Sequence, residues 1–369
     1  MIPGGRPLVL KFGGSSFATP GAYGDLARAL HTRIAASGRR LAIVVSAMPG
    51  ETERLRERLH EVNPRPGDDG VAGLLTLADT VSAHLLAAAL RRLGRSTTVL
   101  AGHENGFTTD RTFMWARLEQ IGPEPLRRAL AEHEVVVVPG GQAADGRARP
   151  TWLGKNSSDL SAVATAVALG ATECEIHSDV AGIHSCDPNR VTDTRLLRDV
   201  SYGDAAAMSL HGAKVLHHRA VRLAERHGIT IRCRHNQEPF LTGTVIGPGG
   251  PDASAVVLNL RSRVLDYPDR ATADLAHQAF LADGVEALRP SDGDGHRVAV
   301  IGGYVDPEET QLRHGVTPGR VNGVPVTVLR EGSARLHTAE GEAAAVRLAQ
   351  RLHDGLAAGA GQVPTPALA

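Results

Sequence analysis

Aromatic residues are scarce in this sequence, at 3% of its 369 positions. The core therefore has to be filled by valine, leucine, isoleucine and alanine, which suits parallel strands covered by helices. Cysteine is scarce too: Cys174, Cys186 and Cys233 are odd in number and unclustered. This usage fits neither a disulfide framework nor a paired-cysteine zinc site, and it indicates a reducing cytoplasm.

An excess of charge of either sign is also missing, because 40 Lys and Arg residues balance 40 Asp and Glu residues. No overall field therefore attracts the chain to nucleic acid or to an anionic membrane surface. The sequence shows neither a charged start followed by an apolar signal run nor a stretch of about 18 apolar residues that could span a bilayer. We expect a soluble protein that binds any anion locally.

Short β-rich runs alternate with helical patterns along the first two thirds of the chain. A length of 369 residues allows about two to three domains. The patterns predict strands at 8–12, 41–46, 97–101, 135–138, 174–178 and 230–233, and helices at 22–36, 73–93, 123–132, 158–169, 202–209 and 214–226. The predicted fold class is α/β.

Glycine and proline dominate residues 247–251, where the periodicity disappears. We place a domain boundary there, between residues 1–250 and residues 254–358. The second part predicts strands at 254–259, 298–304 and 324–329 and helices at 271–281 and 341–356. Residues 359–369 are small and apolar, and we expect them to form a flexible tail.

The first strand runs directly into Lys11–Ser16, a segment with the composition of a phosphate cradle. Two glycines let backbone N–H groups approach an anion, and the lysine adds a full positive charge beside them. For this segment alone, a glycine turn with an exposed lysine is the better interpretation. Three further features favour a phosphate-binding role.

The second feature, Val44–Thr52, is a strand that ends in hydroxyl and glycine positions, which could hold a substrate or cap the next helix. The third, Leu153–Asp159, brings a lysine to the start of a helix, which suits an anion, although Ser and Asp are also ordinary N-caps. The fourth joins Ser178–Pro188 with Gly212–Lys214, loops that can surround a nucleotide. Each signal is weak alone, and their order along the chain is specific.

With these segments in this order, the sequence resembles the aspartate kinase branch of the amino-acid kinase family. The resemblance covers about residues 7–246. It rests on KFGGSS at Lys11–Ser16, VVSAMPGET at Val44–Thr52, LGKNSSD at Leu153–Asp159, SDVAGIHSCDP at Ser178–Pro188, HGAKVLHH at His211–His218 and TGTVI at Thr242–Ile246.

The resemblance implies a kinase that converts the β-carboxylate of aspartate to an acyl phosphate with ATP and Mg²⁺. It also implies the amino-acid kinase fold, a three-layer, mostly parallel sheet between helices, followed by a smaller α+β ACT-like domain. The resemblance also assigns roles to individual residues. Catalysis is assigned to Lys11 and Asp159, and phosphate binding to Gly13, Gly14 and Ser15. Binding of the amino-acid substrate is assigned to Ser46, Thr52, Asp79, Lys155 and Ser158, and binding of the nucleotide to Ser178, Asp179, His184, Asn189, Arg190, Lys214 and Val215. The resemblance assigns no protein ligand to a metal.

The chemistry of the reaction agrees with this set of residues. An aspartate carboxyl group, whose pKa in water is about 3.9, is already ionised at neutral pH, so it needs no general base. Phosphoryl transfer depends mainly on positioning and on neutralising charge, which lysines, N–H groups and a metal ion supply. The sequence lacks the rival nucleotide motifs GxxxxGK[ST], GxGxxG after a strand, and HRD with DFG.

Several positions depart from the family pattern. Lys155 replaces an arginine, so a bidentate fork becomes a point charge, and Asn156 and Ser157 replace two glycines. Asp79 stands where the family has a longer glutamate. On the nucleotide side, His184 replaces a tyrosine and Asn189 an arginine, for which Arg190 could compensate.

Residues 254–358 resemble a shortened pair of ACT units, through which a homodimer is plausible. Two alternatives to an aspartate kinase stay open: a kinase for a related amino acid, and a catalytically silent paralogue that binds nucleotide or amino acid and regulates a partner. For the adjacent histidines His217 and His218 we favour packing or surface roles over metal binding, because neighbours on a helix face different ways.

Overall fold

The computed structural model describes residues 5–180, 182–213, 216–250, 253–290, 296–303 and 305–359. Lys214, Val215 and the predicted tail from residue 360 onward lie outside these ranges. The chain forms two compact units. The first contains Met1–Gly182 and Leu216–Gly250, and the second contains Ile183–Val215 and Pro251–Ala369. Residues 183–215 thus group with the C-terminal residues, whereas the division into a catalytic and a regulatory domain stays a prediction.

A mostly parallel sheet forms the centre of the first unit. Its strand order is β14-β13-β9-β1-β2-β6-β3, in which only the β13–β14 pair is antiparallel. The strands are β1 (Leu8–Phe12), β2 (Leu41–Val45), β3 (Thr97–Val99), β6 (Val135–Pro139), β9 (Glu173–Ser178), β13 (Thr230–His235) and β14 (Thr242–Gly247).

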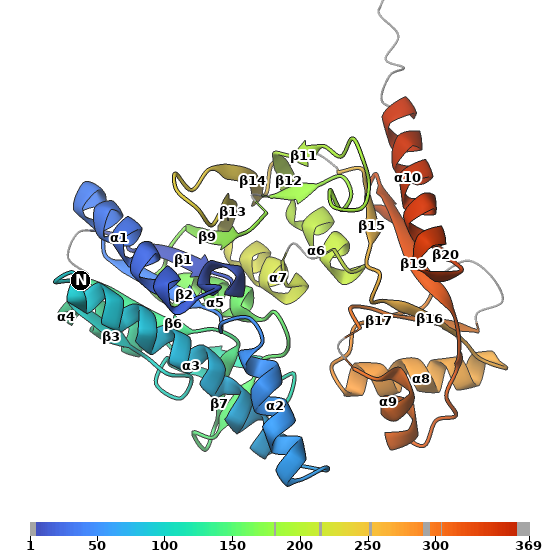
Figure 1. Cartoon of the computed structure of the whole chain (residues 1–369), viewed down its shortest axis with the longest axis horizontal. Coiled ribbons are helices and arrows are strands. Elements are labelled where there is room, and N and C mark those ends of the chain that lie inside the picture. The colour runs from blue at the N-terminus through green and yellow to red at the C-terminus, as the bar shows by residue number, and fades with distance from the viewer. Residues whose placement is uncertain are drawn as a thin grey trace, which may run out of the picture. The chain divides into compact units, whose positions relative to one another are not determined.

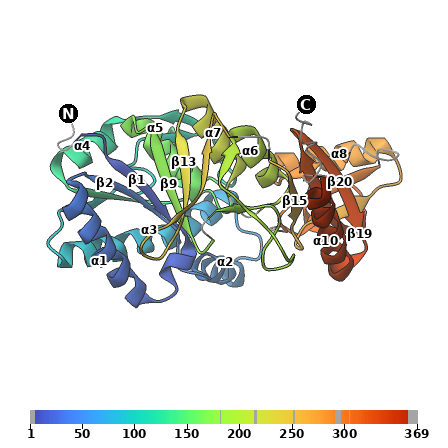
Figure 2. The ribbon, with the colours of Figure 1, turned by 90° about the horizontal axis from the view of Figure 1, so that it is seen from above.

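Helices cover both faces of this sheet (Figure 2). On one face lie α1 and α3, and on the other α4, α5 and α7. The helices of the unit are η1 (Gly14–Phe17), α1 (Pro20–Ser37), α2 (Glu51–Val62), α3 (Asp68–Arg92), α4 (Glu124–Glu132), α5 (Ser158–Leu169) and α7 (His218–His227). This three-layer arrangement confirms the predicted fold class.

The alternation of side chains along β1 sorts its residues between the two helical layers. Leu10 and Phe12 are fully buried in the core cluster that contains α1 and the C-terminal half of α3. Lys11, between them, therefore points to the opposite face, where α5 begins. One strand thus supplies both the core and a charged group of the site.

A small second sheet, of order β5-β4-β7-β8, belongs to the same unit. Its strands are β4 (Phe107–Thr109), β5 (Leu118–Ile121), β7 (Gln142–Asp145) and β8 (Pro150–Trp152). Trp152 packs with Val71, Ala72 and Leu75 of α3 in a separate apolar cluster. This cluster supports the loop between β8 and α5, which carries Lys155.

Among the described residues, α3 is long and apolar enough to cross a membrane, judged by length and composition alone. This corrects the expectation that the sequence contains no such stretch. Polar residues such as Asp79 interrupt the run, which hides it from a search for continuous apolar residues. Half of its most apolar window is buried within the protein, as in a core helix of a globular domain.

The second unit contains a βαββαβ arrangement, the ferredoxin-like order of elements. It comprises β16 (Arg263–Asp266), α8 (Arg270–Ala282), β17 (Ala287–Leu288), β18 (Arg297–Val300), α9 (Pro307–Arg313) and β19 (Arg320–Arg330), with the sheet order β19-β16-β18-β17. α8 packs against this sheet (Figure 1). One complete unit of this kind agrees with the predicted ACT-like region.

The long strand β19 also pairs with two further strands, β15 (Ala255–Leu258) and β20 (Ser333–Ala339). The last helix, α10 (Gly341–Gly359), packs on β15 and β19. This group has fewer elements than the βαββαβ arrangement, as expected for a shortened pair.

Residues 183–215 add β10 (Ile183–His184), β11 (Leu196–Leu197), β12 (Asp199–Ser201) and α6 (Tyr202–Leu210) to the second unit. Hydrogen bonds join this segment to α10. The Oγ of Ser185 lies 2.8 Å from Nε2 of His353, and both side chains are buried. The N–H of Thr192 donates to the side chain of Gln350.

Candidate active site

The carboxyl ends of β1, β2, β6 and β9 meet at one edge of the large sheet, as parallel strands require. Backbone hydrogen bonds fix the loops there: the N–H of Ser46 donates to the carbonyl of Phe12 (3.0 Å), and that of Gly13 to the carbonyl of His177 (3.2 Å). In open α/β sheets, ligands bind outside this edge. The first three sequence motifs all reach it.

Lys11 and Asp159 form an ion pair at this edge, with 2.8 Å between Nζ and Oδ1. They are only 8% and 5% exposed. The second carboxylate oxygen of Asp159 accepts a hydrogen bond from the backbone N–H of His217 (3.1 Å). Asp159 therefore orients the lysine and also anchors the residue that precedes α7.

Two helices thus begin beside Lys11. Asp159 is the second residue of α5, and His217 immediately precedes α7. Unpaired N–H groups and the helix dipole make each N-terminus partly positive. The lysine ammonium lies beside both N-termini, an arrangement that suits phosphate groups, although the carboxylate of Asp159 offsets part of the positive charge.

Close packing requires glycine at Gly14 of the first motif and at Gly140, which follows β6, whereas a Cβ atom on Gly13 would meet only ordinary contacts, from 3.4 Å outward. A Cβ atom on Gly14 would lie 2.9 Å from the carbonyl oxygen of Ala47, and one on Gly140 would lie 2.5 Å from Cβ of Ser158. The amide of Asn236 donates to the hydroxyls of Ser15 and Ser16 (3.3 and 3.2 Å). The turn after β1 is therefore held by its neighbours.

A chain of hydroxyl contacts connects the second and third motifs. The Oγ of Ser46 donates to the Oγ of Ser158 (2.9 Å), and Ser82 of α3 donates to the carbonyl of Ser46 (2.7 Å). Segments far apart in sequence are thus brought together beside Lys11; that they share a substrate site stays a prediction.

Asp79 of α3 lies beneath the same loop and accepts a hydrogen bond from the N–H of Ala47 (2.9 Å). Burial raises the pKa of Asp79 to about 7, although this hydrogen bond and the positive charges of Lys11 and Lys155 act in the opposite direction. Its carboxyl group therefore changes charge near neutral pH. Only 9% of the residue is exposed.

Lys155 forms an ion pair with Glu53, which the sequence patterns did not indicate. Glu53 lies in the first turn of α2, next to Thr52, which is half-buried. Burial tends to raise the pKa of Glu53, but the hydrogen bond and charge of Lys155 outweigh it, and the net effect is a lower pKa. The structure thus places a carboxylate on the lysine that was expected to hold substrate.

The rarity of lysine in the sequence is a signal that marks site positions. Of the 40 basic residues, only Lys11, Lys155 and Lys214 are lysine, and all others are arginine. Each lies in a motif of the resemblance. In a chain that otherwise uses arginine, a lysine marks a position where a compact, mobile ammonium group suits the site better than a planar fork.

The predicted nucleotide contacts divide between the two units. In the first, the hydroxyl of Ser178 donates to the carbonyl of Val180 (2.6 Å), and Asp179 is exposed. In the second, His184 lies in β10, where burial lowers its pKa. Asn189 and Arg190 form a turn on Asp187, to which both donate their backbone N–H groups.

His177 is a further residue at this edge that the sequence patterns missed. Its ring stacks on Phe12, with 4.4 Å between ring centroids, and its carbonyl receives the N–H of Gly13. The side chain of Glu175 also bonds His177, Arg33 and Arg234. Nothing local in the sequence reveals this buried network, because its members come from three different elements.

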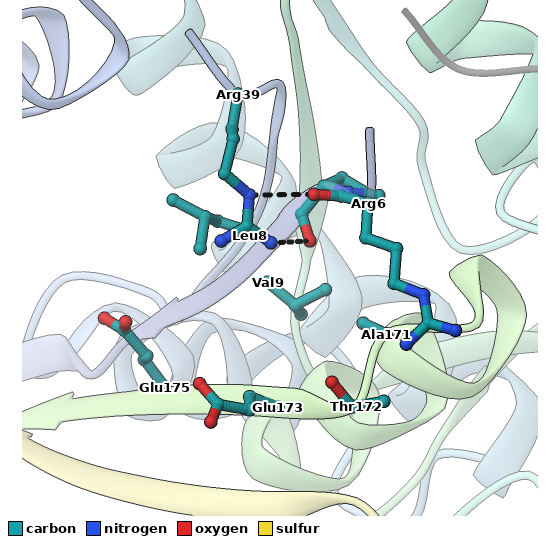
Figure 3. Close-up of a pocket in the computed structure, with 9 residues that line it drawn as sticks. Arg6, Leu8, Val9, Arg39, Ala171, Thr172, Glu173 and Glu175 are labelled. Atoms are coloured by element: carbon teal, nitrogen blue, oxygen red, sulfur yellow. Dashed lines mark hydrogen bonds between the residues drawn. The ribbon is translucent and has the colours of Figure 1, made fainter. Parts of the chain in front are cut away.

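A cavity of about 190 Å³ lies at the opposite end of the strands (Figure 3). It is lined by the residues that begin β1 and β9 and by Arg39, which donates to the carbonyls of Arg6 and Pro7. No residue of the predicted site lines this cavity. It is therefore separate from the strand edge that carries Lys11.

Comparisons with known proteins agree with this geometry. The model of the amino acid kinase family matches residues 6–235. The chain is 38% identical over 233 residues to an aspartokinase of Thermus thermophilus, covering 62% of this chain and 56% of that protein. It is 37% identical over 244 residues to an aspartokinase of Mycobacterium bovis, covering 65% and 57%. The chain thus spans little more than half the length of these relatives.

Solved structures give the same fold. E. coli aspartokinase III in complex with aspartate and ADP superposes with a TM-score of 0.66 at 19% identity, covering 88% of this chain and 87% of that one. Aspartate kinase from Synechocystis superposes with a TM-score of 0.56 at 28% identity, covering 79% and 52%. The resemblance inferred from the motifs is therefore confirmed, and the chain belongs to the amino acid kinase family.

Proposed function

We propose that this protein transfers the γ-phosphoryl group of ATP to the side-chain carboxylate of aspartate. The observation that carries the proposal is the buried Lys11–Asp159 pair, at a strand edge where two helices begin. The aspartokinase relatives, and the aspartate and ADP bound to E. coli aspartokinase III, support the same reaction.

In the proposed reaction, an oxygen of the substrate carboxylate forms a bond to the γ-phosphorus of ATP. The bond from that phosphorus to the β–γ bridging oxygen breaks, and ADP leaves with the electron pair. No proton has to move, because the carboxylate is already ionised. Lys11 and the N-termini of α5 and α7 stabilise the charge on the phosphoryl oxygens.

Asp159 positions Lys11 and does not contact the reacting atoms. Gly13, Gly14 and Ser15 border the phosphates, while Ser46 and Ser158 face the amino acid together with Thr52. The ammonium group of aspartate pairs with the ionised form of Asp79, and its α-carboxylate pairs with Lys155. The nucleotide roles of the remaining assigned residues stay predictions.

Mg²⁺ would neutralise the phosphate oxygens of ATP. The described residues contain no group of three or more His, Cys, Asp or Glu side chains that could hold a metal ion. Mg²⁺ commonly takes most of its ligands from the nucleotide and water, and we expect the same here. The cytoplasmic location and the homodimer inferred from the sequence stay predictions.

The test is ADP release from ATP and Mg²⁺ with aspartate, glutamate or asparagine as the acceptor. Aspartate should stimulate release, asparagine should not, and Lys11→Ala should abolish the stimulated rate. Stimulation by glutamate alone would assign a different substrate. Bound ATP without stimulation by any acid would contradict the proposal.

A further inference from the structure

The ion pair between Lys155 and Glu53 joins the two segments that border the proposed amino-acid site. Lys155 lies in the loop before α5, three residues ahead of Ser158. Glu53 follows Thr52 directly, in the first turn of α2. The pair therefore lies beside the proposed amino-acid site.

Other charged side chains lie near this pair. Arg56, one turn along α2, lies over the ring of Trp152, with 5.9 Å between the guanidinium carbon and the ring centroid. The positive charges of Lys155 and Arg56 both act on the carboxylate of Glu53. Lys155 also acts on Asp79, so it lies within electrostatic range of two acidic groups. Glu53 is the one it contacts.

This pair can open readily. The side chains of Lys155 and Glu53 are 30% and 53% exposed. An exposed ion pair contributes little free energy, because water and salt screen it and both side chains lose rotamer freedom. An ammonium group can also exchange one carboxylate for another by rotation, whereas an arginine fork needs a matched planar partner.

We propose that Glu53 occupies Lys155 in the ligand-free site and competes with the α-carboxylate of the substrate for that lysine. The inference rests on the proposed function, in which Lys155 receives this carboxylate. Glu53 is a positioning residue in this account: it sets the affinity for the amino acid and takes no part in phosphoryl transfer. Removing its charge makes Lys155 available.

The kinetic test is Glu53→Gln, which keeps the size of the side chain and removes its charge. The KM for aspartate should fall roughly two- to fivefold, the range that an exposed ion pair can supply, with kcat unchanged. Glu57→Gln, one helical turn later on the exposed side of α2, is the matched control and should leave both constants unchanged.

A double-mutant cycle isolates the pair. Lys155→Met should raise the KM for aspartate, and adding Glu53→Gln to that variant should cause no further change. Three results would overturn the proposal. The KM for aspartate could rise in Glu53→Gln, it could stay the same in Glu53→Gln, or Glu53→Gln could lower it equally in the presence and absence of Lys155.

The scarcity of lysine supplies a readout that needs no turnover. Reductive methylation with ¹³C-formaldehyde labels the amino groups of Lys11, Lys155, Lys214 and the N-terminus and keeps their charge. The signal that Lys155→Met removes is that of Lys155. It should shift in Glu53→Gln, should not shift in Glu57→Gln, and should move when aspartate is added.

This experiment separates the two proposals. If the chemical shift of Lys155 does not change in Glu53→Gln, the pair is absent in solution and the inference is overturned. If the signal responds to Glu53→Gln, but aspartate causes neither a shift nor turnover, then the proposed substrate is wrong and so is the competition for Lys155.

Discussion

Lys11 and Asp159 are 148 positions apart in sequence, yet their charged atoms lie 2.8 Å apart and are almost completely buried. The alternation along β1 turns Lys11 toward α5, and the first turn of α5 presents Asp159 to it. A buried charge that loses its partner is costly. The pair therefore couples the stability of the fold to the chemistry of the site.

The first prediction concerns this coupling. Lys11→Met should lower kcat/KM by at least about 100-fold, the usual cost of removing one group that stabilises transferred charge. It should also lower the free energy of unfolding by about 3–5 kcal/mol, because it leaves the carboxylate of Asp159 buried and unpaired. Steady-state kinetics and urea unfolding measure the two effects.

The double variant Lys11→Met/Asp159→Asn is the control. It should be more stable than Lys11→Met alone, since no unpaired buried charge remains, and it should stay inactive. A double variant less stable than both single variants would contradict the proposed role of the pair.

The second prediction follows from the raised pKa of Asp79. A folded-state pKa of about 7, against an ordinary value of 3.8, means that the folded state holds this proton more tightly than the unfolded state. The contribution of Asp79 to stability is therefore fully present below about pH 4 and is lost as the pH rises toward 7. A shift of this size corresponds to up to about 4 kcal/mol.

Asp79→Asn removes the titration and keeps an oxygen that can accept the N–H of Ala47. Compared with the wild type, the variant should gain relative stability between pH 4 and pH 7 and show no further gain above pH 8. Unfolding curves measured across this range test the effect. A stability difference that does not vary with pH would show that Asp79 titrates normally.

The third prediction concerns the turn after β1. In Gly14→Ala the new methyl group would lie 2.9 Å from the carbonyl oxygen of Ala47, so one of the two strand-end loops must move. We expect a fall in kcat/KM of about 10-fold or more, because small displacements of positioning groups are costly. Gly146→Ala, which meets no atom within 4 Å, should retain full activity.

The fourth prediction concerns the second unit. Ser185→Ala removes the partner of Nε2 of His353 and leaves that buried ring short of a hydrogen bond. Unfolding of the unit should require about 1–3 kcal/mol less free energy. Ser333→Ala, at an exposed position, should change stability by less than about 0.5 kcal/mol. Equal effects of the two variants would contradict the account.

Sequence reasoning predicted the central strands correctly because their apolar runs are continuous: every residue of β2 and β6 is buried. It missed α2, whose apolar face is narrow: Leu55 and Leu59 are only partly buried against the cluster around Trp152, and the helix buries no residue fully. The helix predicted at 214–226 begins at His218 within the described residues. The strands of the small sheet span only three or four residues, too few to show a period.

The site was predicted through motifs, which record local order along the chain. Lys11, Asp159, Ser46 and Ser158 do gather at one strand edge. The pairing of Lys155 with Glu53 could not be predicted in this way, because it joins positions 102 apart in sequence and depends on where α2 points. The scarcity of lysine marked one member of the pair but not its partner.

The most direct measurement of the central claim is to trap the product with hydroxylamine. The protein is incubated with ATP, Mg²⁺, aspartate and hydroxylamine, and the hydroxamate is identified by mass spectrometry against authentic α- and β-aspartyl hydroxamates. The account predicts the β-hydroxamate, formed only with ATP and absent in Lys11→Ala. The α-hydroxamate, or no hydroxamate from a protein that binds both ATP and aspartate, would contradict it.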